Sequence, residues 1–141
     1  MRFSRNIKRG GYHTTMIVGI GIDIVEVDRI RKALQGTQSM EEKVFTGPEI
    51  QYCRQQKNLY QHFAGRFAAK EAALKALGTG WSQGIRWRDI ETVKGNHGQP
   101  VLELHAKAKK IFETSEANLV LVSITHSSKQ AIAVVVLDTG S

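Results

Sequence analysis

The segment from Leu59 to Leu77 restricts the fold of this chain more than any other part of it. Two phenylalanines and two leucines form one apolar stripe at helical spacing, and seven of the other fifteen positions are alanine or glycine. Gly78 follows directly, and glycine is the residue that most often ends a helix. The pattern therefore predicts one long helix that is either packed on several sides or approached closely by a ligand.

Three charged side chains interrupt this apolar helix. Lys70 falls in the middle of the stripe, Glu71 lies at its edge, and Lys75 stands one turn beyond Glu71. In one interpretation, the ammonium of Lys70 reaches water, and Glu71 and Lys75 form an i,i+4 ion pair on an exposed face. Such a pair stabilises a helix by only roughly 0.3–0.5 kcal/mol. If instead Glu71 binds a divalent cation, the two lysines would hold a phosphate. The helix alone leaves both interpretations open.

Residues 16–27 form a β-rich run without a helical period. Its even positions are valine or isoleucine and predict one apolar face, whereas the odd positions include Gly19, Gly21 and Asp23. Two glycines beside an aspartate leave the strand open to close approach by a backbone or a ligand. Asp23 is therefore a candidate for the second carboxylate of a cation site at Glu71.

The order of the remaining segments predicts an α+β domain rather than a doubly wound α/β one. Shorter helices precede the long one, a glycine-punctuated loop follows it, and the chain closes with a hairpin joined at residues 127–130. We expect helices at 28–34, from Thr46 to about 56, at 59–77 and at 106–114, and strands at 16–27, twice within 89–104 around a turn at 95–98, at 118–126 and at 131–138.

The net charge of the chain is +7, which favours acidic partners such as phosphates, nucleic acid or an acidic protein. Residues 1–15 contribute four basic groups and no carboxylate, so the rest of the chain is only mildly basic, at about +3. We interpret residues 1–15 as a disordered leader or a remnant added to the native chain. Residues 16–141 are then expected to form a single domain.

Several function classes are disfavoured by the sequence. The single cysteine, Cys53, cannot form an internal disulfide, which agrees with a reducing cytoplasm, and it has no supporting motif for a nucleophile. No apolar run reaches the length of a membrane span, and the leader lacks the apolar centre of a secretion signal. The histidines lack the spacing of a zinc site. We therefore predict a cytoplasmic protein without a membrane partner.

Two alternatives come from outside enzymology. The positive charge and two tryptophans, Trp81 and Trp87, suggest a small nucleic-acid-binding module, although no interleaved basic and aromatic motif appears. The second alternative is a trimeric scaffold protein that shares only the fold of an enzyme. An assay of enzymatic activity would distinguish an enzyme from both alternatives.

Three motifs together resemble the holo-acyl-carrier-protein synthase family of 4′-phosphopantetheinyl transferases. They are GIGIDIVEVDRI at 19–30, FAGRFAAKEAALKALGTG at 63–80 and SITH at 123–126, and the likeness extends from Met16 to Asp138. The resemblance implies the 4′-phosphopantetheinyl transferase fold, with an antiparallel sheet packed against the long central helix. It also implies a homotrimer whose sites lie between neighbouring protomers.

The resemblance implies a reaction as well. Such enzymes move the 4′-phosphopantetheine group of coenzyme A to a serine of apo-acyl carrier protein, which supports fatty acid biosynthesis, and release adenosine 3′,5′-bisphosphate. Asp23 and Glu71 match the ligands of Mg²⁺, for which Mn²⁺ could substitute. Glu71 would take the serine proton, directly or through metal-bound water, and Lys75 would contact the phosphates and could protonate the leaving group.

The implied coenzyme A site draws on both ends of the long helix. Arg66 and Lys70 match basic positions that engage the phosphates or hold the site together, and Arg66 is better suited to direct contact. His126 would be a structural residue from its strand position alone, but the SITH motif implies a coenzyme A contact. Many relatives have a basic residue in place of Gln99. The full implied set is Arg66, Lys70, Lys75, Gly78, Thr79, Gly80, Gly98, Pro100 and His126 for coenzyme A, and Arg29 for the carrier protein.

Overall fold

The structure is a computed structural model and describes residues 15–140. The predicted leader lies outside these residues, apart from Thr15. The elements follow in the order β1 (Ile17–Glu26), α1 (Val27–Gly36), α2 (Gln38–Val44), α3 (Gly47–Arg54), α4 (Leu59–Leu77), the 3₁₀ turn η1 (Trp87–Asp89), β2 (Ile90–Lys94), β3 (Pro100–Leu104), α5 (Ala106–Thr114), β4 (Leu119–His126) and β5 (Gln130–Asp138).

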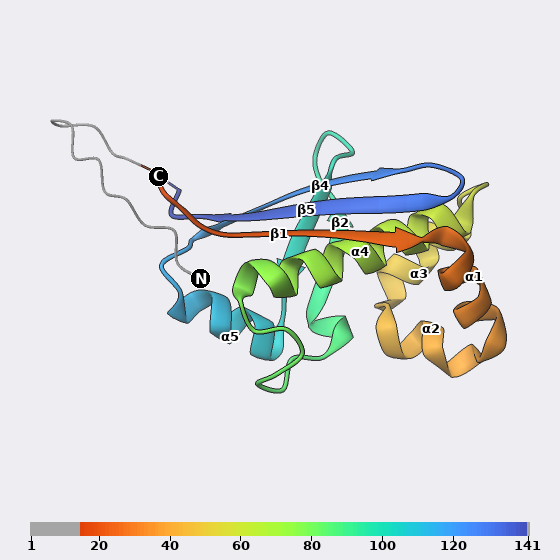
Figure 1. The fold of residues 1–141 in the computed structure, drawn as a ribbon, viewed down its shortest axis with the longest axis horizontal. Helices are drawn as coiled ribbons and strands as arrows, with labels where there is room; N and C mark the ends of the chain where they lie inside the picture. Colours follow the sequence, from red (N-terminus) through yellow and green to blue (C-terminus); the bar gives the residue numbers. More distant parts are fainter. Residues whose placement is uncertain (1–14, 141) are drawn as a thin grey trace, which may run out of the picture.

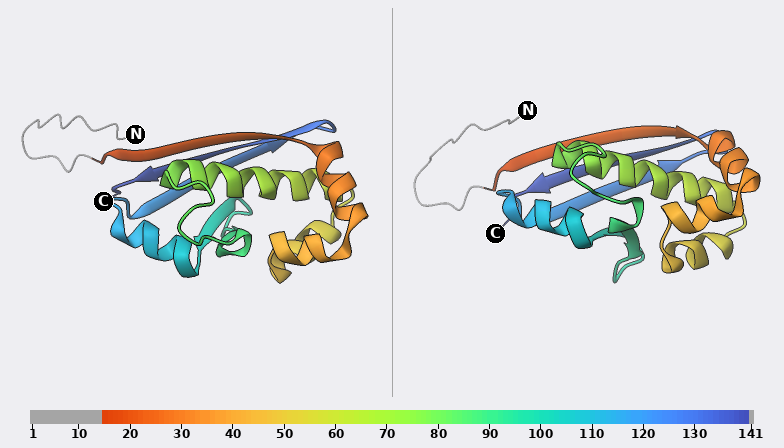
Figure 2. Two further views of the ribbon diagram at one scale, coloured as in Figure 1. Left: turned by 60° about the horizontal axis from the view of Figure 1, so that its bottom comes forward. Right: turned by 90° about the horizontal axis from the view of Figure 1, so that it is seen from below.

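The architecture consists of one larger antiparallel sheet, a separate hairpin and a set of helices. The three-stranded sheet has the order β1-β5-β4, so β1 and β4 are its two edges, and β2 pairs only with β3. The helices lie on one side of the three-stranded sheet, and α4 runs along β1 and β5 (Figure 1, Figure 2). This arrangement confirms the predicted α+β class.

Most elements begin and end close to the predicted positions. The helix α4 covers the predicted 19 residues, and Gly78 ends it in the left-handed conformation with φ of 76°. The helix α2 is absent from our expectations, because its seven residues provide only about two turns of periodicity. Within residues 15–140, no helix combines the length and the hydrophobicity that crossing a membrane requires.

The glycines of β1 allow this strand to lie directly on the backbone of α4. A Cβ atom added at Gly21 would stand 1.9 Å from the carbonyl oxygen of Ala72, and one at Gly19 would stand 2.3 Å from that of Ala76. Any side chain at either position would therefore push the strand away from the helix. The predicted close approach of a backbone to this strand is confirmed.

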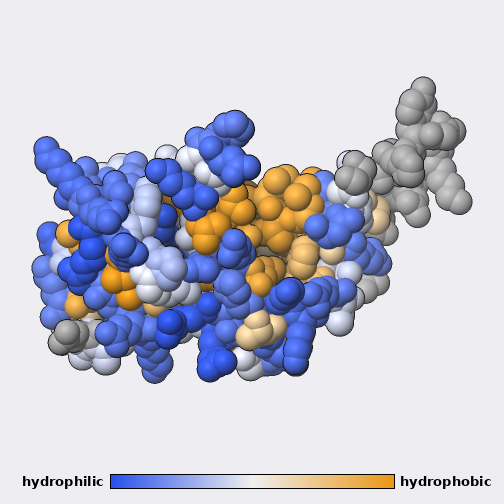
Figure 3. All heavy atoms as spheres, turned by 180° about the vertical axis from the view of Figure 1, so that it is seen from behind, coloured by the Kyte–Doolittle hydropathy of each residue, from blue (hydrophilic) through white to orange (hydrophobic). Residues whose placement is uncertain are grey.

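The opposite face of the three-stranded sheet is apolar, and no helix within residues 15–140 covers it (Figure 2). Residues directly opposite one another share a face, so Ile20, Val136 and Leu121 form one row across the three strands. Along β1, the exposed fractions of Ile20, Ile22 and Ile24 are 57%, 59% and 56%. The side of the molecule that is turned away in Figure 1 carries a separate hydrophobic area among hydrophilic side chains (Figure 3). The predicted apolar face of the first strand therefore points away from the core.

The contact between β1 and α4 predicts a strong effect of one methyl group. Because no space exists for a Cβ at Gly21, Gly21→Ala should lower the free energy of unfolding by about 1–3 kcal/mol or more. The matched control is Gly36→Ala, since a Cβ at Gly36 meets nothing within 4 Å. Urea unfolding followed by circular dichroism measures both, and equal stabilities of the two variants would contradict the packing described above.

Candidate active site

The first group of predicted site residues lies where β1 crosses α4. The ammonium of Lys75 donates to a carboxylate oxygen of Asp23 at 3.1 Å and to the carbonyl oxygen of Ile22 at 2.8 Å. Glu71 stands one helical turn before Lys75. Burial raises the pKa of Glu71, and the negative charge of Asp23 raises it further. The strand and the helix therefore bring the two predicted metal ligands close enough to repel each other.

This carboxylate pair suits a hard divalent cation. Mg²⁺ prefers oxygen ligands and is commonly held by one or two carboxylates, with water and phosphate oxygens completing its shell. A cation between Asp23 and Glu71 would remove the repulsion that raises the pKa of Glu71. The side chains present at this position therefore fit the predicted Mg²⁺.

An aromatic stack supports Glu71 from the loop that follows α4. Trp81 donates a hydrogen bond to the Glu71 carboxylate, which opposes the rise of its pKa. The Trp81 ring lies 3.7 Å from that of Trp87, and Trp87 stacks on Phe67 of α4 at 4.9 Å. We considered these tryptophans only as nucleic-acid contacts in the sequence. The position of Trp81 directly after the GTG turn is the signal that could have indicated its contact with Glu71.

Arg29 and the glycine turn border the same group. Arg29 is exposed on α1, and its positive charge lowers the pKa of Glu71 in opposition to the larger effects above. The N–H groups of Gly78 and Thr79 both donate to the carbonyl oxygen of Leu74. These two N–H groups therefore form the hydrogen bonds that end α4. A Cβ at Gly78 or at Gly80 would meet nothing within 4 Å, so the turn leaves open space beside it.

The second group lines a pocket of about 140 Å³ between α4, the β2–β3 hairpin and the edge strand β4. Arg66, Gly98, Pro100 and His126 all belong to its lining, so the fold brings together four of the predicted coenzyme A contacts. Gly98 has φ of 82° and donates its N–H to the carbonyl oxygen of Gly95 at 3.0 Å, as the turn of the hairpin requires. His126 stands on the helix-facing side of β4, on the same face as Val122 and Ile124.

Arg66 has the environment of an anion contact. Its side chain is 92% buried, since the exposed fraction is 8%, and the guanidinium lies over the ring of Tyr52 at 4.0 Å. Its Nε atom is buried without a hydrogen-bond partner, and within residues 15–140 Arg66 forms no ion pair. His62, which the sequence suggested only as an unsuitable zinc ligand, also lines this pocket.

Lys70 belongs to neither group. Its side chain is fully buried, and its ammonium donates to Glu49 at 2.8 Å, to the carbonyl oxygen of Trp87 at 3.1 Å and to that of Ile90. Burial lowers the pKa of Lys70, and the Glu49 carboxylate opposes this shift. Because these acceptors occupy all three N–H groups, none is left for a phosphate. Of the two predicted roles, the structure favours holding the site together over contact with coenzyme A.

The Lys70–Glu49 pair continues into a network that attaches the hairpin to the helices. The second oxygen of Glu49 accepts the N–H of Thr92 at 3.1 Å, and Thr46 caps α3 in a reciprocal exchange with Glu49. The Thr46 hydroxyl donates to Glu91 at 2.6 Å, and the other oxygen of Glu91 lies 3.0 Å from Nε2 of His105. This chain of contacts fixes the hairpin wall of the pocket relative to α4.

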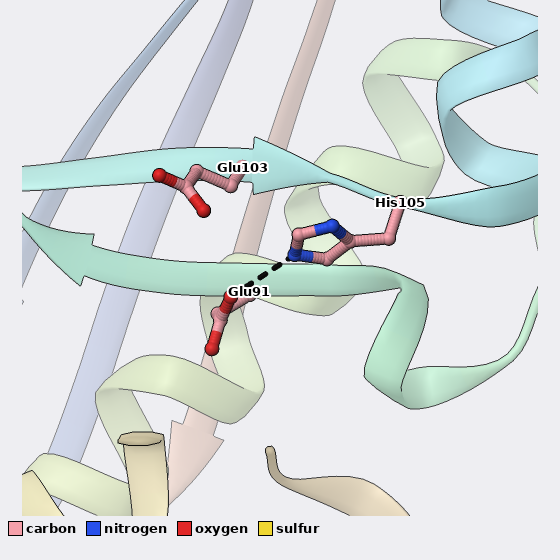
Figure 4. A group of neighbouring side chains, drawn as sticks. All are labelled: Glu91, Glu103 and His105. Carbon is pink, nitrogen blue, oxygen red and sulfur yellow. Dashed lines mark hydrogen bonds and ion pairs between the residues drawn. The ribbon is translucent and has the colours of Figure 1, made fainter. Parts of the chain in front are cut away.

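Glu91, Glu103 and His105 form a second set of potential metal ligands, with one ligand atom of each within 4.8 Å of the others (Figure 4). This set could not be predicted from the sequence, because Glu91 and Glu103 become neighbours only through the register of β2 and β3. Burial alone would raise the pKa of Glu91, but its hydrogen bonds with Thr46 and His105 outweigh this and lower it. These bonds explain the position of Glu91 without a cation.

Comparisons with known proteins agree on one family. A family model described as the 4′-phosphopantetheinyl transferase superfamily matches residues 19–135. A holo-(acyl-carrier-protein) synthase of Geobacter sp. (strain M21) is 44% identical over 124 residues, which cover 87% of this chain and 99% of that protein.

Solved structures with the same fold include two complexes. The structure of a holo-(acyl-carrier-protein) synthase from Bacillus anthracis in complex with CoA (3′,5′-ADP) is 39% identical, with a TM-score of 0.72, and the match covers 89% of this chain and 99% of that one. The synthase of Helicobacter pylori in complex with coenzyme A is 33% identical, with a TM-score of 0.72 and coverages of 84% and 98%.

The buried ion pair predicts that Lys70 acts through stability. Lys70→Met should lower the free energy of unfolding by about 3–5 kcal/mol, because it leaves the Glu49 carboxylate buried without its cation. Adding Glu49→Gln should recover part of this loss, whereas the exposed Lys75→Met should change stability by less than about 1 kcal/mol. Chemical denaturation of the four proteins measures these effects. A Lys70→Met variant as stable as the parent would exclude the anchoring role.

Proposed function

Because the chain belongs to the holo-(acyl-carrier-protein) synthase family of 4′-phosphopantetheinyl transferases, we propose that it transfers the 4′-phosphopantetheine group of coenzyme A to a serine of an apo-acyl carrier protein. The reaction would depend on Mg²⁺ and release adenosine 3′,5′-bisphosphate. The observation that carries this proposal is the repelling pair Asp23 and Glu71 beside the ammonium of Lys75. Membership of this family leaves no support for a nucleic-acid module or a pure scaffold.

Each member of the carboxylate group has a chemical role in this proposal. Mg²⁺ held by Asp23 and Glu71 would neutralise the pyrophosphate charge and favour attack on the β-phosphorus. Glu71 is the candidate base for the serine proton, directly or through metal-bound water, because its carboxylate belongs to the group that would hold the cation beside the reacting phosphate. Lys75 is exposed enough to turn from Asp23 towards the leaving phosphate and stabilise its charge.

The Arg66 pocket is the candidate site for the nucleotide end of coenzyme A. At about 140 Å³, it has room for a phosphate group. The unpartnered Nε of Arg66 and the rings of His62 and His126 offer donors for that phosphate. Gly98 and Pro100 would then lie beside the adenine, with Gln99 making a polar contact where many relatives would make an ionic one.

The two halves of this site lie on opposite edges of the three-stranded sheet, which supports a homotrimer with shared sites. Asp23 belongs to β1, one edge, whereas His126 belongs to β4, the other edge. In a cyclic trimer, β1 of one protomer would come next to β4 of its neighbour and bring the halves together. The exposed isoleucines Ile20, Ile22 and Ile24 would be covered in the same interface.

The carrier protein would approach along α1. Arg29 is exposed there and close enough to the carboxylate pair for its charge to affect Glu71. A cation at the rim of a site mainly increases the rate at which an acidic partner associates. We therefore propose Arg29 as a contact of the acidic carrier, in a cytoplasmic protein whose partners are this carrier and coenzyme A.

Mass spectrometry of the carrier tests the proposed reaction. With coenzyme A, Mg²⁺ and apo-carrier, the wild type should add one phosphopantetheine group to the carrier. Glu71→Gln should reduce the rate by about 100-fold or more with little loss of stability, since it removes a charge from the metal ligands and the candidate base. The control Glu103→Gln, an exposed carboxylate outside this group, should retain the rate. No transfer by the wild type with any divalent metal would refute the proposal.

A mixing experiment tests whether the site is shared. Glu71→Gln and Arg66→Gln should each be inactive alone, because each damages one half of every site. After unfolding and refolding together in equal amounts, random trimers should regain about a quarter of wild-type activity, because a quarter of the interfaces would combine two intact halves. Activity that stays at the level of the separate variants, with trimers detected by light scattering, would place each site within one protomer.

A further inference from the structure

The pocket beside Arg66 has a one-sided charge distribution. Among the described residues, its titratable or charged lining consists of Arg66, Lys94, His62, His126 and the phenol of Tyr52, and no carboxylate belongs to it. Positively charged groups that gather without a carboxylate are stabilised when an anion arrives. The buried, unpartnered Nε of Arg66 is an independent sign that a ligand completes this pocket.

His62 lies at the centre of these positive groups. Its ring packs against the edge of His126 from β4 at 4.8 Å and against Tyr52 from α3 at 5.7 Å. Arg66 lies one turn further along α4, and its guanidinium stacks on the same Tyr52 ring that His62 contacts. Burial lowers the pKa of His62, and the charges of His126 and Arg66 lower it further. Without an anion in the pocket, His62 is therefore neutral at neutral pH.

His126 is held in one tautomer. Its Nδ1 lies 2.9 Å from the amide oxygen of Gln61, and an amide oxygen only accepts, so Nδ1 carries the proton. In the neutral ring, Nε2 is then an acceptor and cannot donate to a phosphate. The ring becomes a donor at both nitrogens only when it takes up a second proton.

We propose that His62 and His126 form a proton-accepting pair that takes up a proton from solvent when a phosphate group enters the Arg66 pocket. This inference rests on the proposed function, because it takes the phosphate to be that of the nucleotide end of coenzyme A. Protonated His62 pairs with the phosphate, and the proton returns to solvent when the nucleotide leaves. The affinity for the nucleotide therefore depends on pH through the protonation of His62.

The direction of the pH effect follows from the uptake of a proton. A ligand that raises the pKa of a group binds more tightly as pH falls through the range between the free and bound pKa values. The affinity for adenosine 3′,5′-bisphosphate should therefore increase as pH falls through this range. In His62→Phe, which keeps an aromatic ring against Tyr52, this pH dependence should be largely lost, whereas binding itself should persist with lower affinity.

The test uses the wild-type protein and adenosine 3′,5′-bisphosphate as the probe. Proton NMR follows the Cε1–H resonances of the imidazoles during pH titration, with and without saturating probe, and His62→Phe assigns the His62 signal by its absence. We expect the pKa of His62 to rise by at least about one pH unit on binding. Calorimetry in two buffers of different ionisation enthalpy should show proton uptake by the wild type and much less by His62→Phe.

Each outcome decides the proposal. If the probe binds and His62 titrates at the same pH as in the free protein, the proton-accepting pair is refuted while the proposed function stands. If the probe does not bind at all, the proposed nucleotide site and this inference both fail. His97→Gln, which removes an exposed imidazole that does not line the pocket, should leave the proton uptake unchanged, and a loss there equal to that of His62→Phe would also refute the role of His62. The NMR titration decides the question even if His62→Phe does not fold.

Discussion

The contact of β1 with the backbone of α4 determines where the candidate catalytic groups stand. Gly19 and Gly21 bring the strand so close to the helix that the next odd position, Asp23, comes beside Glu71 and Lys75. A charged cleft between a strand and a helix normally needs side chains to hold it open. Here the absence of side chains on the strand brings the carboxylates together, and the alanines of α4 provide the flat surface that the strand needs.

The same helix is fixed on its other side by charge rather than by shape. The fully buried pair of Lys70 and Glu49 connects α4 to α3, and its neighbours Thr46 and Glu91 connect both to the hairpin. Burying an ion pair is costly unless its remaining donors and acceptors are satisfied, and this network satisfies them. The pocket that contains Arg66 is thus walled by elements held in register through polar contacts, which specify one arrangement more strictly than apolar packing does.

The sequence was sufficient for the features that are local along the chain. The helix Leu59–Leu77, its glycine end and the cap at Thr46 follow from periodicity and turn chemistry, and the family motifs indicated Asp23 and Glu71. What the sequence could not resolve depends on distant partners. Lys70 remained ambiguous because Glu49 lies on another helix, and His62 gained a role only through the rings of Tyr52 and His126 around it.

The exposed apolar face of the three-stranded sheet would lower the solubility of a free protomer, but the proposed shared site would need the same face. An isolated protomer presents Ile20, Ile22 and Ile24 along an edge strand, which is the kind of surface that leads to aggregation. Polar substitutions there would make a free protomer less prone to aggregate in dilute solution, yet they would remove the surface on which the proposed shared site would be assembled. In the proposed trimer, activity would therefore depend on the concentration of the protomer as well as on the residues of the site, because a complete site forms only on assembly.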